Sequence, residues 1–351
     1  MIRKLLVMVL ALMLLTGCVN LQQPEPQALT QYNATFLTLF DTVTTVVGRY
    51  PSEKEFSEVT QAFHDELLEY HQLFDIYNDY EGLNNLKTIN DQAGIAPVEV
   101  DARIIDLLTD CKVYYELTGG KVNVAMGSVL YLWHVARNDS IDDPAKAYTP
   151  DPEKLQKAAE HCSFDSIIID AERSTVFIED PDHRLDVGAV AKGWSLQRVA
   201  ENCPSGLLIS VGGNVVATGP KDDAGTPWVV GVTNPDGGNY LHTLNVSRGS
   251  VVTSGDYQRF YQVEGITYHH IIDPVTLFPS NYWRSVTIVC DDSGLADALS
   301  TALFLLPQSE GQALLDSCGA EALWMDLEGN LHYSTNFESL IRTYSCIEVK
   351  I

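Results

Sequence analysis

The second half of the chain contains a series of short apolar segments separated by turn-forming residues. Each segment is bounded by Gly, Asn, Asp or Pro, a pattern typical of β-strands rather than helices. The expected strands are residues 166–170, 175–178, 207–211, 228–232, 241–246, 251–254, 267–272, 285–289 and 322–325, and one near Leu331. Strands that follow one another through short connections predict a largely antiparallel sheet.

Helical periodicity dominates the part of the chain that precedes these strands. Ser52 and Glu55 have the spacing of a capping box, and apolar residues recur at helical steps from Phe56 to Leu67. A second helix is expected from about Asp101 to the glycine pair 119–120, and others at residues 154–161, 194–201 and 294–306. Residues 138–152, rich in Asp and Pro, predict a loop. The expected fold is therefore α+β: helices followed by a largely antiparallel sheet with interspersed helices.

The N-terminus has the features of an export signal. Arg3 and Lys4 precede an unbroken apolar run at residues 5–15, which is too short to span a bilayer. The sequence L-T-G-C at residues 15–18 matches a lipoprotein signal-peptidase site, although an ordinary secretory signal with a chance cysteine is the alternative. We expect a signal peptide at 1–17, a lipidated Cys18 and tether at 18–31, and a folded domain at 32–351. The protein is then extracytoplasmic and lipid-anchored to the bacterial membrane.

Charge and cysteine usage narrow the classes of function. The chain has 22 Lys+Arg against 47 Asp+Glu and a formal net charge of −25, which disfavours nucleic acid as a partner. Six cysteines besides Cys18 leave disulfides possible, but there is no C-x-x-C and several lie in apolar segments. Buried free thiols are the favoured interpretation, and a zinc site is not expected.

The segment L-D-V-G-A-V-A-K-G, residues 185–193, combines small residues with a lysine at the start of a helix. Small side chains let a ligand approach the backbone, and a helix N-terminus with a lysine favours phosphate. Neither the Walker P-loop nor the G-x-G-x-x-G spacing is present. The structural alternative is a tight strand-to-helix turn.

Two further segments carry polar side chains in apolar surroundings. Asp297 and Thr301 are four residues apart on an apolar helix, so their oxygens share a face that could bind Mg²⁺. Their alternative roles are a helix-dipole interaction and a bond to a backbone carbonyl. In H-H-I-I-D-P, residues 269–274, strand alternation places His269 and His270 on opposite faces, which excludes a paired metal site. His270 could act as a general base or be structural.

These segments occur in the order found in the ApbE family, the FAD:protein FMN transferases. The resemblance covers about residues 35–304 and rests on L-D-V-G-A-V-A-K-G, V-G-G-N (211–214), T-S-G-D-Y (253–257), H-H-I-I-D-P and A-D-A-L-S-T-A (296–302). It implies metal-dependent cleavage of FAD, release of AMP and transfer of FMN to a Thr or Ser hydroxyl of an acceptor protein. The implied acceptor is a subunit of an electron-transfer complex or an exported flavoprotein.

The resemblance also implies roles for individual residues. The Mg²⁺ ligands are Asp297, Thr301 and the carbonyl region of Ala189, and the activating base is His270. The residues expected around FAD are Phe40, Tyr77, Lys121, Val122, Asn123, Asp186, Lys192, His270 and Ile272. Two positions depart from the family pattern: Asn123 replaces an aspartate, and Leu277 replaces the glycine that commonly follows D-P-x-T.

Two other functions remain compatible with the same residues. An FAD pyrophosphatase would use water as the acceptor and release free FMN. A non-catalytic flavin-binding lipoprotein would bind FAD and leave it intact.

Overall fold

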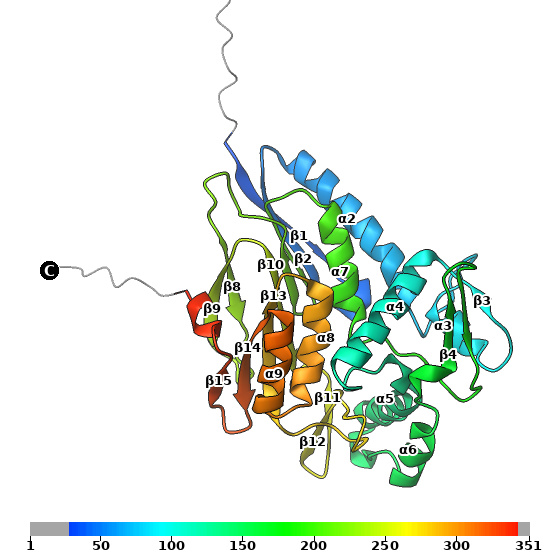
Figure 1. Ribbon diagram of the computed structural model, residues 1–351. Helices are drawn as coiled ribbons and strands as arrows, with labels where there is room; N and C mark the ends of the chain where they lie inside the picture. The colour runs from blue at the N-terminus through cyan, green and yellow to red at the C-terminus, as the bar shows by residue number, and fades with distance from the viewer. Residues whose placement is uncertain (1–27, 343–351) are drawn as a thin grey trace, which may run out of the picture.

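The computed structural model describes residues 28–342 and is built around one antiparallel sheet (Figure 1). The sheet has eight strands in the order β1-β2-β6-β7-β10-β13-β14-β15. Its strands are β1 (Thr30–Phe36), β2 (Thr44–Tyr50), β6 (Leu207–Val211), β7 (Asn214–Ala217), β10 (Gly249–Gly255), β13 (Trp283–Cys290), β14 (Glu321–Asp326) and β15 (Leu331–Tyr333). Every neighbouring pair is antiparallel, which confirms the predicted α+β class.

Helices cover one face of this sheet, where the main hydrophobic core lies (Figure 1). The helices of the molecule are α2 (Glu53–Phe74), α3 (Leu86–Asp91), α4 (Ala102–Leu117), α5 (Gly127–Asp142), α6 (Pro152–Ala159), α7 (Ala191–Asn202), α8 (Ser293–Phe304) and α9 (Gln308–Cys318). Leu67, Leu196 and Leu299, from α2, α7 and α8, are fully buried together with strand residues. Burial of each such side chain contributes about 1.5–3 kcal/mol.

Helix α2 begins as its capping residues predict. The Ser52 side chain accepts a hydrogen bond from Glu55 N at 3.3 Å and donates one to Glu55 Oε1 at 2.8 Å. Phe56, Phe63 and Leu67 are buried on one face of the helix. The periodicity of the sequence thus places α2 correctly against the sheet.

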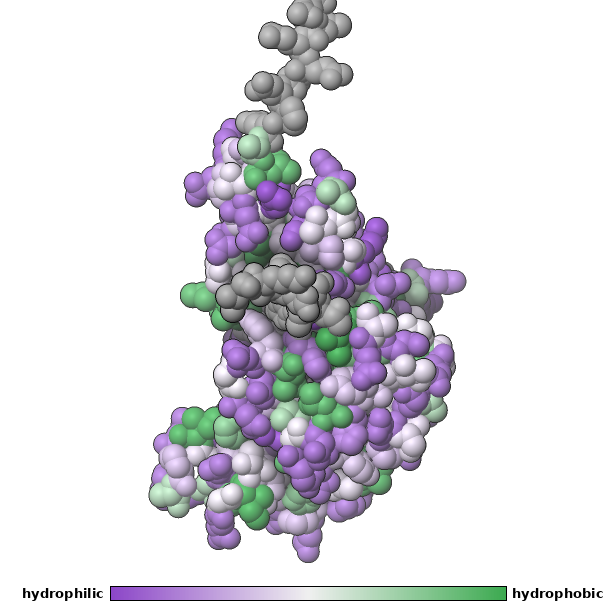
Figure 2. All heavy atoms as spheres, turned by 90° about the vertical axis from the view of Figure 1, so that its left-hand side faces the viewer, coloured by the Kyte–Doolittle hydropathy of each residue, from purple (hydrophilic) through white to green (hydrophobic). Residues whose placement is uncertain are grey.

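Small sheets complete the fold. A three-stranded sheet contains β3 (Val98–Glu99), β5 (Thr175–Ile178) and β4 (Ile167–Asp170), and two hairpins contain β8 (Trp228–Val232) with β9 (His242–Val246) and β11 (Phe260–Val263) with β12 (Ile266–His269). The β8–β9 hairpin packs on the sheet face opposite the helices and forms a second core. Figure 2 shows the side that carries this hairpin, where apolar side chains form small separate groups among hydrophilic ones.

The chain order differs from the expectation at two places. Strands β1 and β2 precede the helices, and β1 begins at Thr30, inside the expected tether. β1 is largely polar, T-Q-Y-N-A-T-F, because it is an edge strand with exposed or half-exposed side chains. The loop predicted for 138–152 is wrong at its start, since α5 continues to Asp142; its face from Trp133 to Ser140 is buried, and this packing outweighs the Asp-rich composition.

Several predictions concern the termini. The signal peptide, Cys18 and most of the tether lie outside the described residues, as does Cys346. Five cysteines within residues 28–342, Cys111, Cys162, Cys203, Cys290 and Cys318, are free thiols as expected, but only Cys111 and Cys290 are buried; the other three are half-buried. Within the same residues, none of the helices has the length and apolarity needed to cross a membrane.

Candidate active site

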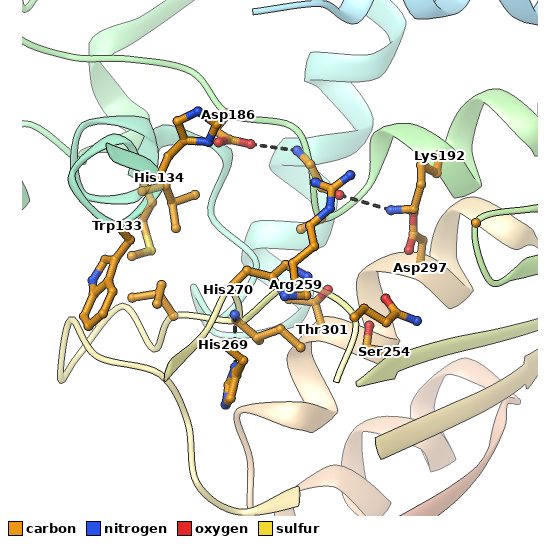
Figure 3. Close-up of a pocket in the computed structure, with 18 of the residues that line it drawn as sticks. Trp133, His134, Asp186, Lys192, Ser254, Arg259, His269, His270, Asp297 and Thr301 are labelled. Carbon is orange, nitrogen blue, oxygen red and sulfur yellow. Dashed lines mark hydrogen bonds and ion pairs between the residues drawn. The ribbon is translucent and has the colours of Figure 1, made fainter. Parts of the chain in front are cut away.

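A cavity of about 550 Å³ lies where α5, α7 and α8 meet β10 and the β11–β12 hairpin (Figure 3). It brings together residues that are far apart in the sequence, with acidic, basic, hydroxyl and aromatic side chains on its wall. The predicted site residues that line it are Tyr77, Lys121, Val122, Asn123, Asp186, Ala189, Lys192, His270, Ile272, Asp297 and Thr301. Among the residues expected to contact FAD or Mg²⁺, Phe40 is the one outside this lining.

Asp297 is the most buried acidic group of the cavity wall. Its Oδ2 accepts a hydrogen bond from Gly193 N at 2.8 Å and lies 3.9 Å from Lys192 Nζ. Burial raises the pKa of Asp297, against the opposing effects of Lys192, the Gly193 N–H and the Asn214 amide. Asn214 Nδ2 is buried near this carboxylate and has no hydrogen-bond partner among residues 28–342. The carboxylate therefore lies among donors that favour its charge but do not fully compensate for its burial.

Gly193 permits this contact between α7 and α8. A Cβ at position 193 would lie 2.3 Å from Ser293 O, 2.5 Å from Asp297 Cβ and 3.0 Å from Asn214 Nδ2. Only glycine allows the first turn of α7 to approach α8 so closely. The backbone N–H of Gly193, in the first turn of α7, thus donates to a carboxylate of the protein. It is therefore not available to bind the phosphate predicted at this helix end.

Thr301 lies one turn after Asp297 on α8, and its hydroxyl is not used within the helix. Thr60, Thr109 and Thr118 in other helices each donate to the carbonyl four residues earlier. Thr301 makes no such bond among residues 28–342, although it lines the cavity. The structural alternative for Thr301 is therefore absent, and its oxygen is free to bind a ligand.

The loop 186–190 forms the wall next to the start of α7. Asp186 accepts a hydrogen bond from Gly188 N at 2.9 Å, and burial raises the pKa of its carboxyl. Lys192 Nζ donates to Gly188 O at 3.4 Å and points into the cavity (Figure 3). These bonds keep the loop folded back on the helix, with Ala189 at the cavity surface.

The two adjacent histidines have different environments, as strand alternation predicts. His269 is buried, accepts at Nδ1 from Ile271 N at 3.2 Å and therefore donates from Nε2 to Ser280 O at 2.6 Å. The imidazole of His270 is open to the cavity and makes no hydrogen bond within the described chain. Desolvation of the imidazole by the cavity wall, together with the charge of Arg259, lowers the pKa of His270. The ring is therefore neutral at pH 7.

Lys121 and the 273–277 turn close another side of the cavity. Lys121 Nζ forms an ion pair with Asp273 Oδ2 at 3.0 Å. Asn123 is occupied structurally, because its Oδ1 accepts from Ala125 N and its Nδ2 donates to Cys162 O. Leu277 has φ +63°, the conformation that a glycine at this position would adopt readily. Its side chain is 4% exposed, so burial of the leucine offsets the strained backbone.

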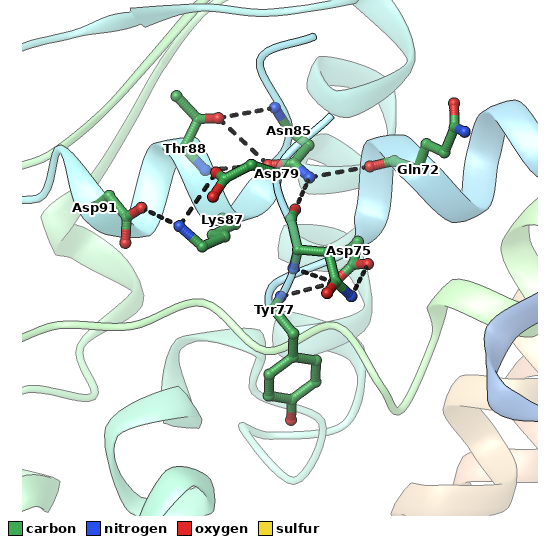
Figure 4. Close-up of polar contacts among 9 residues, drawn as sticks. Gln72, Asp75, Tyr77, Asp79, Asn85, Lys87, Thr88 and Asp91 are labelled. Carbon is green, nitrogen blue, oxygen red and sulfur yellow. Dashed lines mark hydrogen bonds and ion pairs between the residues drawn. The ribbon is translucent and has the colours of Figure 1, made fainter. Parts of the chain in front are cut away.

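Tyr77 is held by a polar network between α2 and α3 (Figure 4). Asp75 Oδ1 accepts from Tyr77 N at 2.7 Å and Asn78 N at 3.1 Å, and Asn85 Nδ2 donates to Asn78 O at 2.9 Å. The Tyr77 ring extends away from this network and stacks on His134, with ring centroids 5.1 Å apart. The network thus fixes an aromatic surface at the cavity.

Phe40 is placed differently from the expectation. Its ring packs edge-on against His71, with centroids 5.5 Å apart, and its backbone N–H donates to His71 Nδ1. Its neighbours Asp41 and Thr42 line the cavity instead. The backbone at Phe40 and Asp41 has positive φ, which turns the ring away and could not be inferred from composition.

Several residues of the cavity wall were not predicted from the sequence. They are Met126, Leu130, Trp133, His134, Arg137, Ser254, Gln258, Arg259, Tyr261 and Tyr268, among others. Arg259 follows the quoted T-S-G-D-Y segment by two residues, and a basic residue beside a ligand-binding turn in so acidic a chain was an available signal. No sequence pattern marked Trp133 and His134 as site residues, because they belong to a helix that was not predicted from the sequence.

Comparison with known proteins relates this chain to one family. The ApbE family model matches residues 32–324. An FAD:protein FMN transferase of Treponema pallidum is 35% identical over 277 residues, 73% of this chain and 75% of that protein. One of Klebsiella pneumoniae is 30% identical over 266 residues, 72% of this chain and 79% of that protein. The crystal structure of the ApbE protein from Thermotoga maritima has a TM-score of 0.79 and 27% identity, and covers 90% of this chain and 100% of that one. The chain therefore belongs to the ApbE family.

Proposed function

We propose that the protein is an FAD:protein FMN transferase that uses a divalent cation, preferentially Mg²⁺, and releases AMP. The observation that carries this proposal is the meeting of a buried carboxylate, an unused threonine hydroxyl, a lysine and a neutral histidine in one cavity. Phosphoryl transfer depends mainly on positioning and charge neutralisation. These four groups supply both, and the names of the relatives agree with this reaction.

The proposed metal ligands are Asp297, Thr301 and the carbonyl of Ala189. Carboxylate, hydroxyl and carbonyl oxygens are the donors that Mg²⁺ takes, with water and phosphate oxygens completing its shell. The fit rests on Thr301, whose hydroxyl lacks the usual bond within the helix, and on the buried charge of Asp297. When bound, the ion neutralises diphosphate charge and polarises the phosphoryl oxygens.

The remaining residues would bind the substrate and move a proton. Lys192 would contact the diphosphate, and Asp186, Tyr77, Ile272 and the 121–123 segment would line the FAD site. His270 would accept the proton of the acceptor hydroxyl as its oxygen attacks phosphorus. Its lowered pKa keeps the imidazole in the form that can take this proton at neutral pH.

The acceptor and the location are parts of the same proposal. We propose an acceptor protein from an electron-transfer complex or an exported flavoprotein, carrying the reactive Thr or Ser. Lipid on Cys18 would anchor the enzyme outside the cytoplasm. Mass spectrometry of the mature protein tests this point, because a chain that starts at a diacylated Cys18 is expected and one that retains residues 1–17 would refute it.

One reaction separates transfer from the two alternatives. The protein is incubated with FAD, Mg²⁺ and the apo form of an electron-transfer subunit, followed by in-gel flavin fluorescence and chromatography of nucleotides. Fluorescent acceptor together with AMP supports transfer. Free FMN with AMP, independent of acceptor, would identify a pyrophosphatase. Intact FAD would identify a binding protein and refute the proposed activity.

A further inference from the structure

Two arginines of the cavity form no ion pair with an acidic side chain of residues 28–342. Arg259 lines the cavity, and its guanidinium makes no hydrogen bond or ion pair with residues 28–342. Arg137 lines the same wall; within the described part of the chain, its one side-chain hydrogen bond is a 3.5 Å contact with Asn138, and its buried Nε has no partner. Burial and the charge of Arg259 both lower the pKa of Arg137. The two cations therefore repel each other, and neither forms a direct ion pair with residues 28–342, although the charge of Arg259 also acts on the Asp186 carboxylate.

Arg137 and Arg259 differ from the other described arginines in that both line one cavity. With 47 Asp+Glu against 22 Lys+Arg, an arginine readily finds a carboxylate. Several other arginines do so: Arg49 with Asp222, Arg103 with Asp101, Arg198 with Asp110, and Arg284 with Asp256. Arg184, which lies over the Tyr131 ring, and the exposed Arg248 form no ion pair among residues 28–342, but neither lines the cavity. A cavity wall with two arginines that are not ion-paired within the described residues therefore indicates an anionic ligand, since guanidinium groups match phosphate geometry well.

The position of Arg259 separates it from the groups proposed to hold the metal. Its side chain extends into the cavity between His134 and the Lys192–Asp297 pair (Figure 3). Lys192 lies 3.9 Å from Asp297 and Lys121 lies 3.0 Å from Asp273, whereas Arg259 forms no ion pair within the described residues and acts on Asp186 only without direct contact. Of the three cationic positions of the cavity, that of Arg259 and Arg137 is therefore the one without a directly paired carboxylate among residues 28–342.

An aromatic surface adjoins the two arginines. The charges of Arg137 and Arg259 act on both Tyr77 and His134, whose rings stack 5.1 Å apart at the cavity wall. An aromatic surface next to this cationic position suits a nucleoside monophosphate, because its flat base can stack on the rings while its phosphate meets the arginines. Both halves of FAD have this form, and the chemistry of the reaction decides between them.

In the proposed transfer, the acceptor oxygen forms a bond to the phosphorus of the FMN half. The bond from that phosphorus to the bridging oxygen breaks, and its electron pair stays on the bridging oxygen, which leaves as part of AMP. The acceptor proton goes to His270. The leaving AMP phosphate therefore gains one negative charge, and a cation that is not ion-paired stabilises such developing charge most effectively.

We propose that Arg259 and Arg137 bind the phosphate of the leaving AMP, an assignment that rests on the transferase function proposed above. Lys192 and the cation near Asp297 then hold the phosphate that is transferred. Loss of either arginine weakens binding of AMP and leaves binding of FMN nearly unchanged.

Calorimetric titration of the mature protein with AMP and with FMN, in the presence of Mg²⁺, tests this assignment. The variants are Arg259→Gln and Arg137→Gln, and the control is Arg248→Gln, an exposed arginine outside the cavity lining. Hydrogen bonds to charged groups predict an increase of about 10- to 100-fold in the AMP dissociation constant. FMN binding should change by less than about 3-fold, and the control should match the wild type.

The other outcomes would overturn the assignment. Unchanged AMP affinity in Arg259→Gln, or a loss of FMN affinity instead, would show that the arginines do not hold the leaving phosphate. If Arg137→Gln fails to fold, Arg259→Gln decides alone, because Arg259 is exposed. If the wild type cleaves FAD and Arg259→Gln binds AMP with wild-type affinity, only this inference is refuted. A wild-type protein that releases no AMP from FAD refutes the proposed function as well.

Discussion

Gly193→Ala tests whether the contact between α7 and α8 positions the reactive groups. A Cβ at 193 would lie 2.3 Å from Ser293 O and 2.5 Å from Asp297 Cβ, whereas ordinary contacts begin at 3.4 Å, so the helices must separate by about 1 Å. An added carbon in a packed interior costs about 1–3 kcal/mol, and alanine returns about 1 kcal/mol of helix propensity. The net loss of unfolding free energy is therefore about 0–2 kcal/mol.

The effect on the reaction should be much larger than the effect on stability. A displacement of about 1 Å in a reacting group costs about 100-fold in rate, so AMP release from FAD should fall by at least that factor. Gly311→Ala in α9 is the matched control, because its Cβ would meet only side chains, at 3.2–3.3 Å, and it lies outside the cavity lining. Rates are compared with thermal unfolding by circular dichroism. Near-wild-type turnover of a folded Gly193→Ala protein, or equal loss in the control, would refute the reasoning.

Three further predictions concern single residues. Leu277→Gly relieves the strain of a positive φ, worth about 1–2 kcal/mol, but both this variant and Leu277→Ala lose a buried side chain worth about 2–5 kcal/mol. Urea denaturation should therefore find the glycine variant at least as stable as the alanine variant. A clearly more stable alanine variant would contradict the proposed backbone strain. Burial lowers the pKa of His183 from 6.5 to about 4, so as pH falls this histidine is protonated in the unfolded chain before it is protonated in the folded one. The unfolding free energy should therefore fall as pH drops from about 6.5 to 4, by at most about 1.4 kcal/mol per pH unit. His183→Asn should flatten this slope, and an unchanged slope would exclude His183 as its source. The lowered pKa of His270 predicts that kcat stays constant as pH falls through 6.5, and that His270→Ala slows transfer more than it weakens FAD binding; a half-loss of kcat near pH 6.5, or an unchanged rate in the variant, would contradict its role as base.

The sequence predicted the elements that have strong periodicity. The helix from Glu53 and the strand of residues 207–211 were recognised because their buried faces repeat at helical and alternating spacing. Edge strand β1 escaped recognition because its solvated side chains give no apolar pattern. Helix α5 escaped because its buried face, from Val129 to Ser140, is carried by a mixed sequence with little amphipathic contrast.

The candidate site was predictable where short motifs fix local chemistry. Spacing singled out Asp297, Thr301 and Lys192 as candidates, and the family resemblance implied their roles; the structure places all three at one cavity. Arg259 could have been noted from its place beside the T-S-G-D-Y segment, whereas Arg137 could not, because only the fold brings it to the cavity wall next to Arg259. Phe40 was misplaced relative to the cavity because the positive φ values at Phe40 and Asp41 turn its ring toward His71.

The central claim is that Asp297 and Thr301 hold a divalent cation that binds the diphosphate of FAD. The most direct test is a calorimetric titration of Mg²⁺ into protein saturated with FAD, for the wild type, Asp297→Asn, Thr301→Val and Thr301→Ser. One site is expected in the wild type, with affinity lost in Asp297→Asn, reduced about 10-fold or more in Thr301→Val and largely retained in Thr301→Ser. Wild-type Mg²⁺ affinity in a folded Asp297→Asn protein would contradict the account.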